Sequence, residues 1–269
     1  MGKNNKLPCV LTIAGSDSGA GAGIQADLKA MAAQRTYGLT VITAVTAQNT
    51  LGVKQFFVMT PQLVAAQLDA VLQDFPVTAV KTGMLGNVSI VEVIAAKLKE
   101  YGLRRVVVDP VMVTKSGDSL LERDTQTAIR EILLPLSLVI TPNIPEAEVL
   151  CGQKINDIVD MREAAQLLQK DGAAFVLLKG GHMQGEDMLT DVLFDGKKFY
   201  YYRARRINTK NTHGTGCTYA SALAAFIALG HPVPQAVWKA RFYLQGILQR
   251  DPALGKGHGP MDHFAMMVK

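Results

Sequence analysis

Cysteine is scarce in this chain of 269 residues, which contains only three. Cys9, Cys151 and Cys217 lie far apart, and no two of them form a Cys-x-x-Cys pair. This spacing argues against a disulfide scaffold and against a metal site built from thiolates. Isolated cysteines fit a reducing compartment, so we expect a cytoplasmic protein.

Long apolar runs are also missing, and none approaches the ~20 residues that span a bilayer. The N-terminus has the lysines and the apolar stretch of a signal peptide, but Pro8 begins that stretch and Asp17 interrupts the pattern. We interpret residues 7–14 as a first strand instead. The sequence therefore predicts no membrane partner.

A long basic surface is absent as well, although the formal net charge is +5. The densest basic run consists of Arg203, Arg205, Arg206 and Lys210. It lacks the length and the interleaved aromatic residues of a nucleic-acid surface, so we expect no nucleic-acid partner. The run precedes a glycine turn, which favours the phosphates of a small ligand; a solvated strand edge is the alternative.

The chain does contain a regular alternation of apolar strand and helix patterns. Strand patterns occur at 10–14, 39–45, 77–81, 106–108, 138–140 and 175–178. Helical patterns occur at 24–31, 61–72, 87–98, 218–229 and 235–248. Asp195-Gly196 between two short β patterns is a hairpin signal. The sequence predicts one three-layer α/β domain over residues 1–269, with a mostly parallel central sheet and an antiparallel hairpin edge.

A glycine-rich loop, Gly15 to Gly23, joins the first strand to the first helix. Nucleotide-binding units have this strand–loop–helix form. The loop is not a dinucleotide fingerprint, because no Gly-x-Gly-x-x-Gly register fits, and no Gly-Lys-Ser/Thr of a Walker loop follows. The glycines favour close approach of a ligand or a lid to the backbone.

A second glycine turn, Asn211 to Cys217, opens directly into the helix at 218–229. A helix start has unpaired N–H groups and about half a positive charge, which makes it an anion site. Gly214 and Gly216 let the backbone approach an oxyanion, and we expect the same field to stabilise the thiolate of Cys217. Such an arrangement indicates transfer of a negatively charged group, above all phosphoryl. A plain turn and a packed cysteine are the alternatives.

Together these blocks resemble the ribokinase-like superfamily and, within it, the hydroxymethylpyrimidine/phosphomethylpyrimidine kinases of thiamine biosynthesis. The resemblance covers essentially the whole chain and rests on Ala-Gly-Ser-Asp (14–17), Gly-Ile-Gln-Ala-Asp-Leu-Lys (23–29), Thr-Ala-Gln-Asn-Thr (46–50), Gly-Met-Leu (83–85), Asp-Pro-Val-Met (109–112), Thr-Pro-Asn-Ile-Pro-Glu-Ala (141–147), Lys-Gly-Gly-His (179–182), Asn-Thr-Lys-Asn-Thr-His-Gly-Thr-Gly-Cys (208–217) and Gly-Lys-Gly-His-Gly-Pro (255–260).

The resemblance implies a ribokinase-like α/β/α fold and an ATP-dependent kinase. The implied substrate is 4-amino-5-hydroxymethyl-2-methylpyrimidine, which gains one phosphate and then a second. Cys217 is implied as the base for the substrate hydroxyl, with Gly214, Thr215 and Gly216 as the anion hole for the transferred phosphoryl group. A homodimer is a further expectation from the family.

The nucleotide side of the implied site combines cations, amides and carboxylates. Its candidate ATP ligands are Lys179, Asn143, Thr209 and Lys210. Asp109 and Glu146 are candidates to hold Mg²⁺ directly or through water, because this ion prefers oxygen ligands. An ordinary carboxylate in the first turn of a helix is the alternative for Glu146.

The acceptor side needs hydrogen-bond partners and an apolar wall for an aminopyrimidine. Gln48 offers an amide that both donates and accepts, which matches an amino group beside a ring nitrogen. Met84 and Val111 supply apolar contacts, with a plain core role as the alternative for Met84. Gly15 and Asp27 belong to the substrate-side loop of the family.

The chain departs from the family pattern at Ala20, where the family has glycine. Many superfamily members have Asp at the position of Cys217, whereas the cysteine is typical of the pyrimidine and pyridoxal kinase branch. Cys217 therefore disfavours a sugar kinase, whereas the methyl group of Ala20 bears on how the loop packs over the substrate.

Pyridoxal kinase is the nearest alternative, because it shares the fold and often the Gly-Thr-Gly-Cys turn. Gln48 favours the pyrimidine. Some pyridoxal-preferring relatives also carry a second cysteine in the lid segment, where this chain has Val113-Thr114-Lys115. A non-catalytic binding module is disfavoured because a base, metal carboxylates and an anion hole occur together.

Overall fold

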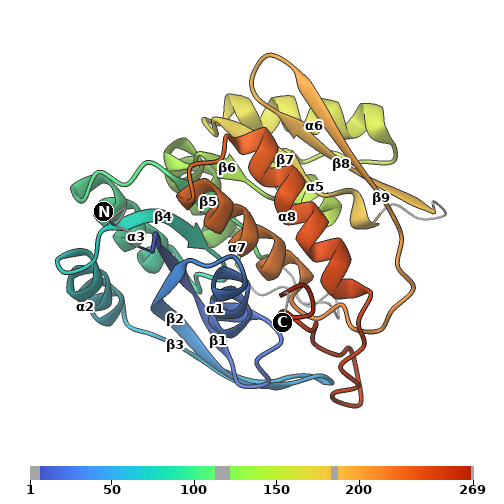
Figure 1. The fold of residues 1–269 in the computed structure, drawn as a ribbon. Coiled ribbons are helices and arrows are strands. Elements are labelled where there is room, and N and C mark those ends of the chain that lie inside the picture. The colour runs from blue at the N-terminus through green and yellow to red at the C-terminus, as the bar shows by residue number, and fades with distance from the viewer. Residues whose placement is uncertain (1–6, 113–121, 183–186, 268–269) are drawn as a thin grey trace, which may run out of the picture.

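A nine-stranded sheet forms the centre of the computed structural model, which describes residues 7–112, 122–182 and 187–267 (Figure 1). The strands lie in the order β3-β2-β1-β4-β5-β6-β7-β8-β9. Their bounds are Cys9–Asp17 (β1), Tyr37–Asn49 (β2), Gly52–Val58 (β3), Val77–Thr82 (β4), Val106–Val108 (β5), Val139–Ile140 (β6), Phe175–Leu178 (β7), Met188–Phe194 (β8) and Phe199–Arg205 (β9). The six strands from β2 to β7 in this order are parallel, whereas β3, β8 and β9 pair antiparallel.

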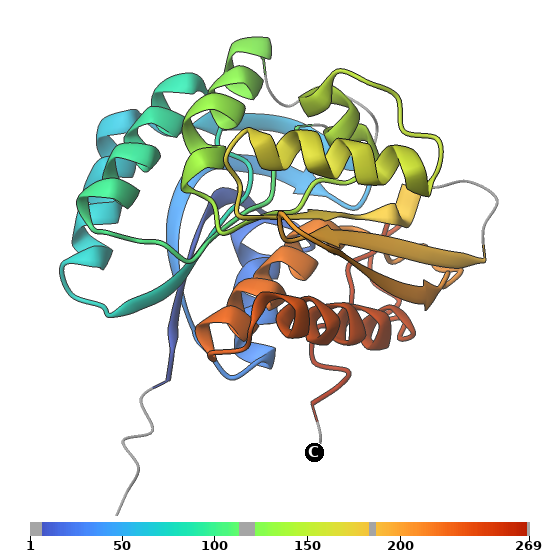
Figure 2. The ribbon, with the colours of Figure 1, turned by 90° about the horizontal axis from the view of Figure 1, so that it is seen from above.

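Helices cover both faces of the sheet, which gives three layers (Figure 2). One face carries α1 (Gly23–Ala33), α7 (Thr215–Ala228) and α8 (Val233–Leu248). The other carries α2 (Pro61–Leu72), α3 (Val88–Glu100), α4 (Arg123–Ala128), α5 (Ile144–Cys151) and α6 (Ile158–Lys170). A π turn and a 3-10 turn, Ile129–Leu133 and Leu134–Leu136, continue α4, and a 3-10 turn spans Gly180–His182. Among the described residues, no helix is long and apolar enough to cross a bilayer.

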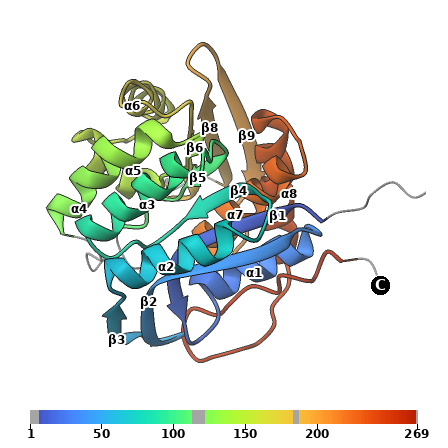
Figure 3. The same ribbon diagram turned by 90° about the vertical axis from the view of Figure 1, so that its left-hand side faces the viewer.

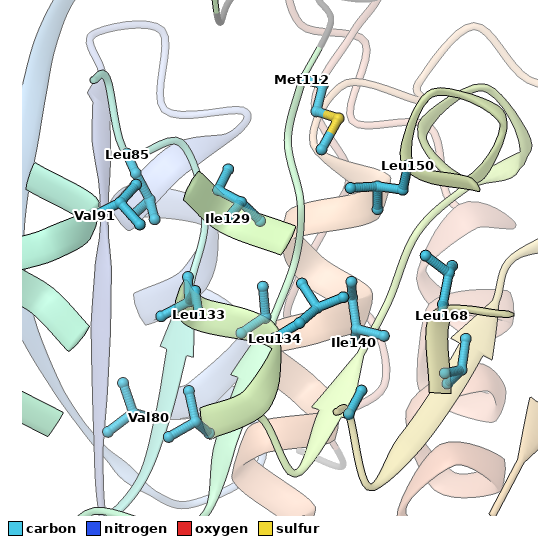
Figure 4. Packing of buried hydrophobic residues seen from close by; sticks show 14 of the residues in the cluster. Val80, Leu85, Val91, Met112, Ile129, Leu133, Leu134, Ile140, Leu150 and Leu168 are labelled. Atoms are coloured by element: carbon cyan, nitrogen blue, oxygen red, sulfur yellow. The ribbon is translucent and has the colours of Figure 1, made fainter. Parts of the chain in front are cut away.

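The apolar strands are continuous because helices bury them from both sides. In β1, Val10 packs toward one layer of helices while Leu11 and Ile13 pack toward the other, and all three are fully buried. Figure 4 shows the second of these cores, where Leu134 and Ile140 belong to one cluster of buried side chains. Burying one such side chain contributes roughly 1.5–3 kcal/mol.

The structure confirms the predicted fold class and most of its elements. Helix α2 begins at Pro61 as predicted, and Thr60 caps it by accepting a hydrogen bond from the N–H of Leu63. The helical pattern at 87–98 begins at Asn87, which caps α3 by accepting a hydrogen bond from the N–H of Ile90. Helix α7 begins at Thr215, before the predicted start at Thr218, so Cys217 lies inside its first turn.

The sequence pattern does not predict strand β3. Almost all of its residues are exposed, so it lacks the alternation of a half-buried strand. It forms because it pairs antiparallel with β2, which extends to Asn49, beyond its predicted end. Figure 3 shows β3 at the outer edge of the sheet, and Phe56 and Phe57 on it are 52% and 66% exposed.

The parallel strands end at one edge of the sheet, where ligands bind in open α/β folds. β1 ends at Asp17 and β2 just after Gln48. Asp109 follows β5, and Lys179 follows β7. The topology therefore gathers the predicted polar residues at the same edge, beside the start of α7.

Candidate active site

The start of helix α7 is the centre of the candidate site. Gly214 is its N-cap, with a left-handed φ of 78°, and no side chain caps the helix. A Cβ at Gly214 would clash with the carbonyl oxygen of Gly21, so the two glycine-rich loops touch here. The N–H of Thr215 makes a long hydrogen bond of 3.4 Å to the carbonyl oxygen of Thr212, and it lies with the N–H of Gly216 in a first turn without a side-chain cap, as an anion site requires.

A pair of opposite charges lies over this helix start. Lys179 Nζ is 2.9 Å from Asp109 Oδ1, and Thr141 Oγ1 donates to the same oxygen at 2.9 Å. A Cβ at Gly216 would be 3.5 Å from Lys179 Nζ and 3.7 Å from Asp109 Oδ2. Burial disfavours both charges, but Lys179 and Lys81 hold the pKa of Asp109 below its usual range, and Asp109 raises the pKa of Lys179. Both groups are therefore charged at neutral pH.

Asn143 and Glu146 form a capping box at the start of α5. Asn143 Oδ1 accepts from the N–H of Glu146 at 2.9 Å, and Glu146 Oε2 accepts from the N–H of Asn143 at 2.8 Å. Burial raises the pKa of Glu146 to about 7. The positive charge of Lys179 opposes this rise, and the negative charge of Asp109 adds to it. Glu146 is thus a carboxylate in the first turn of a helix, which was the alternative interpretation of this residue.

The two carboxylates fit a hydrated Mg²⁺. Asp109 uses Oδ1 for Lys179 and Thr141, and its Oδ2 lies toward Gly216; Glu146 uses Oε2 for the helix cap. Each carboxylate therefore commits one oxygen to these contacts. Within the described ranges, no three His, Cys, Asp or Glu side chains form a metal cluster. A metal here would be held largely by water and ligand phosphates, which is usual for Mg²⁺.

The structure corrects the expectation of a stabilised thiolate at Cys217. The residue is partly exposed, but burial of the thiol raises its pKa to about 11. Lys81 and a backbone hydrogen bond from Gly23 favour the thiolate, whereas the carboxylates of Asp27 and Asp109 oppose it. Burial outweighs the favourable groups, so the thiolate is a minor species at neutral pH.

Asp27 also lies elsewhere than its predicted role requires. It is fully buried, and its carboxylate pairs with Lys81 Nζ at 2.9 and 3.0 Å and accepts from Thr12 Oγ1 and Ser221 Oγ, each at 2.6 Å. With no exposed surface, Asp27 cannot contact a substrate directly in this conformation. Sequence reasoning missed Lys81, although a lysine inside the apolar strand β4 was the available signal, because lysine is rarely buried unless paired.

Asp17 organises the glycine-rich loop after β1. Its carboxylate accepts hydrogen bonds from the N–H groups of Gly19, Gly21 and Ala22 at 2.8, 3.0 and 2.8 Å. His213 Nε2 lies 2.9 Å from the same carboxylate, and the His213 ring packs against Gly21. These contacts fix the loop against the turn that precedes α7, which is a structural role for His213.

The amide of Gln48 lies between two polar neighbours. Thr46 Oγ1 is 3.0 Å from the carbonyl oxygen of Ser16 and 3.1 Å from Gln48 Oε1. His213 Nε2 is 2.9 Å from Asp17 Oδ2 and 3.3 Å from Gln48 Nε2. The Thr46 hydroxyl therefore contacts the amide oxygen of Gln48, and the amide nitrogen of Gln48 faces the imidazole of His213. The second N–H and lone pair of Gln48 then remain for a ligand.

Gly15 and Met84 are neighbours, as an apolar wall requires. A Cβ at Gly15 would be 3.4 Å from Met84 Sδ, and Thr43 Oγ1 donates to the carbonyl oxygen of Met84 at 2.6 Å. Met84 is partly exposed and therefore differs from a core methionine. Val111 is partly exposed too, and its N–H donates to the carbonyl oxygen of Asp109 at 2.9 Å. Val111 thus lies beside the charged pair.

Comparison with known families decides the wider assignment. The model of the phosphomethylpyrimidine kinase family matches residues 17–262. The chain belongs to this family. The bifunctional thiamine biosynthesis protein ThiED of Geobacter sulfurreducens is 52% identical over 95% of this chain, and the hydroxymethylpyrimidine/phosphomethylpyrimidine kinase of Bacillus subtilis is 49% identical over 95%. The chain spans 52% of the Geobacter protein and 94% of the Bacillus kinase.

Solved structures of phosphomethylpyrimidine and pyridoxal kinases share the fold. An ADP complex of Bacillus subtilis pyridoxal kinase superimposes with a TM-score of 0.91 at 37% identity, covering 98% of this chain and 100% of that one. Phosphomethylpyrimidine kinase from Clostridium difficile gives 0.79 at 41% identity, covering 89% and 98%. Sequence identity is higher to the pyrimidine kinase, although the overall geometry is closer to the pyridoxal kinase.

Two further residues of the phosphomethylpyrimidine kinase pattern lie apart from the charged pair. Thr209 and Lys210 line a hollow of about 410 Å³ together with the end of α8. Among the described residues, no hydrogen bond joins either of them to Lys179 or Asp109; Thr209 Oγ1 instead accepts from the N–H of Asn211. The lid segment 113–115 lies outside the described residues.

Ala20 adopts a backbone conformation that suits the glycine of the family. Its φ is 58°, in the left-handed region. The N–H of Ala20 donates to the carbonyl oxygen of Asp17 at 2.9 Å, and Lys29 donates to the carbonyl oxygen of Ala20 at 2.8 Å. The loop therefore keeps its shape despite the methyl group, at a cost of roughly 1–2 kcal/mol.

Proposed function

We propose that this chain is an ATP-dependent kinase that phosphorylates 4-amino-5-hydroxymethyl-2-methylpyrimidine to its monophosphate and then to its diphosphate. The single observation that carries the proposal is the uncapped start of α7 under the Lys179–Asp109 pair, with Cys217 in the same turn. Membership of the phosphomethylpyrimidine kinase family supports the same reaction.

The transferred phosphoryl group would lie at the N–H groups of Gly214, Thr215 and Gly216. Phosphoryl transfer depends mainly on positioning and on neutralising charge, so preoriented amides and a nearby cation suffice. Lys179 supplies that cation, and its contact with Asp109 holds the ammonium over the helix start. Asn143, the N-cap of α5, forms an isolated parallel β-bridge with Lys179.

Cys217 takes the proton of the substrate hydroxyl in the first transfer. Its thiolate is a minor species at neutral pH, but a strong base when it forms. The second transfer needs this base less, because a phosphate monoester is already largely ionised at pH 7, with a second pKa of about 6.

Asp109 and Glu146 would hold Mg²⁺ in this proposal, with ATP as the phosphate donor. The metal would supply charge neutralisation for the phosphates. Thr209 and Lys210 contact the nucleotide from the hollow beside the end of α8. An ADP complex of the pyridoxal kinase from Bacillus subtilis supports a nucleotide site in this fold.

The aminopyrimidine ring binds between the amide edge of Gln48 and the apolar wall of Gly15, Met84 and Val111. A donor and an acceptor on one amide match the amino group and the adjacent ring nitrogen. Pyridoxal is the second candidate substrate, because the pyridoxal kinase structure superimposes closely on this chain.

We further propose a cytoplasmic homodimer of one-domain chains. Strand β3 leaves Phe56 and Phe57 exposed on a sheet edge, and such an edge is normally covered. A second copy paired at β3 would complete the hydrogen bonds of the edge and cover part of the two side chains, which lie on opposite faces of the strand.

The proposed reaction is tested by ADP release from Mg-ATP with either pyrimidine or pyridoxal, with the product masses measured alongside. The pyrimidine gains one phosphate and then two. Rapid pyridoxal turnover with slow pyrimidine turnover would contradict the assignment of Gln48 but keep the phosphoryl chemistry. No ADP above the ATP-only control with either substrate would contradict the kinase itself.

A further inference from the structure

Helices α1 and α7 meet beneath the candidate site through two matched contacts. Gly23 and Asp27 are four residues apart on α1, and Cys217 and Ser221 are four residues apart on α7, so each pair lies on one face of its helix. The backbone of Gly23 hydrogen-bonds to the Cys217 sulfur, and Ser221 Oγ donates to Asp27 Oδ1 at 2.6 Å. The first turn of α7 is therefore fastened to α1 one helical turn below the thiol.

Lys81 completes this arrangement from β4. Its ammonium and the Asp27 carboxylate are 2.9 Å apart, and neither side chain has exposed surface. A buried ion pair contributes little net stability, because desolvation offsets the attraction between the charges. The pair therefore needs a further reason for its place below Cys217. The charge of Lys81 acts on Cys217 and Asp109 as well as on Asp27.

Four charged groups act on Cys217 from the elements packed around it. Lys81 on β4 and Lys179 after β7 are cationic, and Asp27 on α1 and Asp109 after β5 are anionic. The charges are balanced, so removing one cation leaves an excess of negative charge at the sulfur. Removing one carboxylate leaves an excess of positive charge there.

We propose that the buried Asp27–Lys81 pair is a positioning element for Cys217. Asp27 holds α7 against α1 through its hydrogen bond with Ser221, one helical turn after Cys217. Lys81 supplies positive charge that offsets the carboxylates around the thiol. Neither residue touches substrate. The catalytic importance of the pair rests on the proposed role of Cys217 as a base. The effect of the pair on the thiol does not depend on that role.

The test is the rate at which iodoacetamide alkylates Cys217, measured between pH 7.5 and 9.5 without ATP or pyrimidine. The parent protein carries Cys9→Ala and Cys151→Ala, which leaves Cys217 as its only cysteine. Below the thiol pKa the rate follows the thiolate fraction, offset in part because a thiolate of higher pKa is a better nucleophile. A rise of one unit in the pKa therefore slows alkylation about threefold at fixed pH. Mass spectrometry of the modified peptide confirms the site.

Lys81→Met slows alkylation by about threefold, and Asp27→Asn accelerates it, because the two changes alter the local charge in opposite directions. Lys97→Met is the matched control; it removes a lysine on α3 from its ion pair with Asp69 on α2 and leaves the rate unchanged. Shifts of the same sign in both variants, or no shift in either, would overturn the proposal.

If the single variants do not fold, the Asp27→Asn/Lys81→Met double variant decides the question. Lys81 acts on the thiol more strongly than Asp27, so the double variant is alkylated at least about twofold more slowly than the parent. An equal rate contradicts the proposal. Because alkylation needs no turnover, the result is independent of whether the chain phosphorylates pyrimidines.

Discussion

Cys217 shows how neighbouring groups set the chemistry of one side chain. It lies in the uncapped first turn of α7, where the helix field favours an anion, and burial still raises its pKa to about 11. The usual thiol pKa is near 9. A base of this kind is strong but scarce at neutral pH, which makes its contribution depend on pH.

The rate of the first phosphoryl transfer should therefore rise with pH. Because the pKa of Cys217 is raised, its thiolate fraction grows about tenfold per pH unit between pH 7 and pH 9. Cys217→Ala should lose most of this slope. Single-turnover rates with the pyrimidine over this range measure it. An equally steep slope in the variant would mean that another group accepts the proton.

The sequence predicted the residue types of the site better than their environment. The sequence predicts that Lys179 and Gly214 belong to the site because one follows a strand and the other lies in a glycine turn. Strand ends and glycine turns are local features of the sequence. The burial of Asp27 and its pairing with Lys81 depend on contacts between α1, β4 and α7, which are distant in the chain. No local pattern contains that information.

At the scale of elements, loops and terminal segments hold the start of α7 in place. The loop after β1 touches Gly214, and Asp17 binds three of its N–H groups. On the other side, His263 in the C-terminal segment contacts Thr218, one residue after Cys217. The anion site is therefore fixed by segments from both ends of the chain.

Ala20→Gly should stabilise the protein by roughly 0.5–1 kcal/mol. The substitution relieves a left-handed alanine, and this gain exceeds the added entropy of the unfolded chain. Urea unfolding measures the change in the free energy of unfolding. Ala66→Gly, the same change at an exposed position of helix α2, is the control and should destabilise by about 1 kcal/mol. Destabilisation by both would show that the Ala20 conformation is unstrained.

His263 should make the protein sensitive to mild acid. Its Nε2 accepts from Thr218 Oγ1 at 2.9 Å, and burial lowers its pKa from 6.5 to about 4. The unfolded chain then binds a proton that the folded chain does not, so this stability is present above pH 6.5 and is lost as the pH falls toward 4. The full loss is about 3 kcal/mol.

His263→Gln tests this account of the acid sensitivity. The free energy of unfolding of the variant should lie below that of the wild type at pH 7, and the wild type should lose about 3 kcal/mol relative to the variant as the pH falls toward 4. Urea unfolding at several pH values measures the difference. A difference that does not change with pH would show that protonation of His263 is not the cause.

At the scale of the whole molecule, the parallel centre and the β8–β9 hairpin were predictable, whereas β3 was not. Central strands are buried on both faces, which produces apolar runs that sequence reveals. β3 is exposed on both faces, so its phenylalanines show no pattern relative to the core of one chain. The exposed phenylalanines of this edge strand have a physical explanation only when another surface covers them.

Phe57→Lys should convert a homodimer into monomers. Phe57 is 66% exposed on β3, and a lysine there places charge in the proposed contact. Sedimentation velocity of both proteins measures the change. Phe242→Lys on α8, at a residue that is 59% exposed, is the matched control and should remain dimeric. A monomeric wild type, or dissociation by Phe242→Lys alone, would place the interface elsewhere or nowhere.

The most direct test of the central claim compares the two phosphoryl transfers in single-turnover experiments with wild type and Cys217→Ala. Both proteins receive Mg-ATP with either the hydroxymethylpyrimidine or its monophosphate. If one site catalyses both steps and Cys217 serves as base, the variant slows the first transfer far more than the second, because the monophosphate is already largely ionised. An equal loss in both transfers would contradict the role of Cys217 as a base.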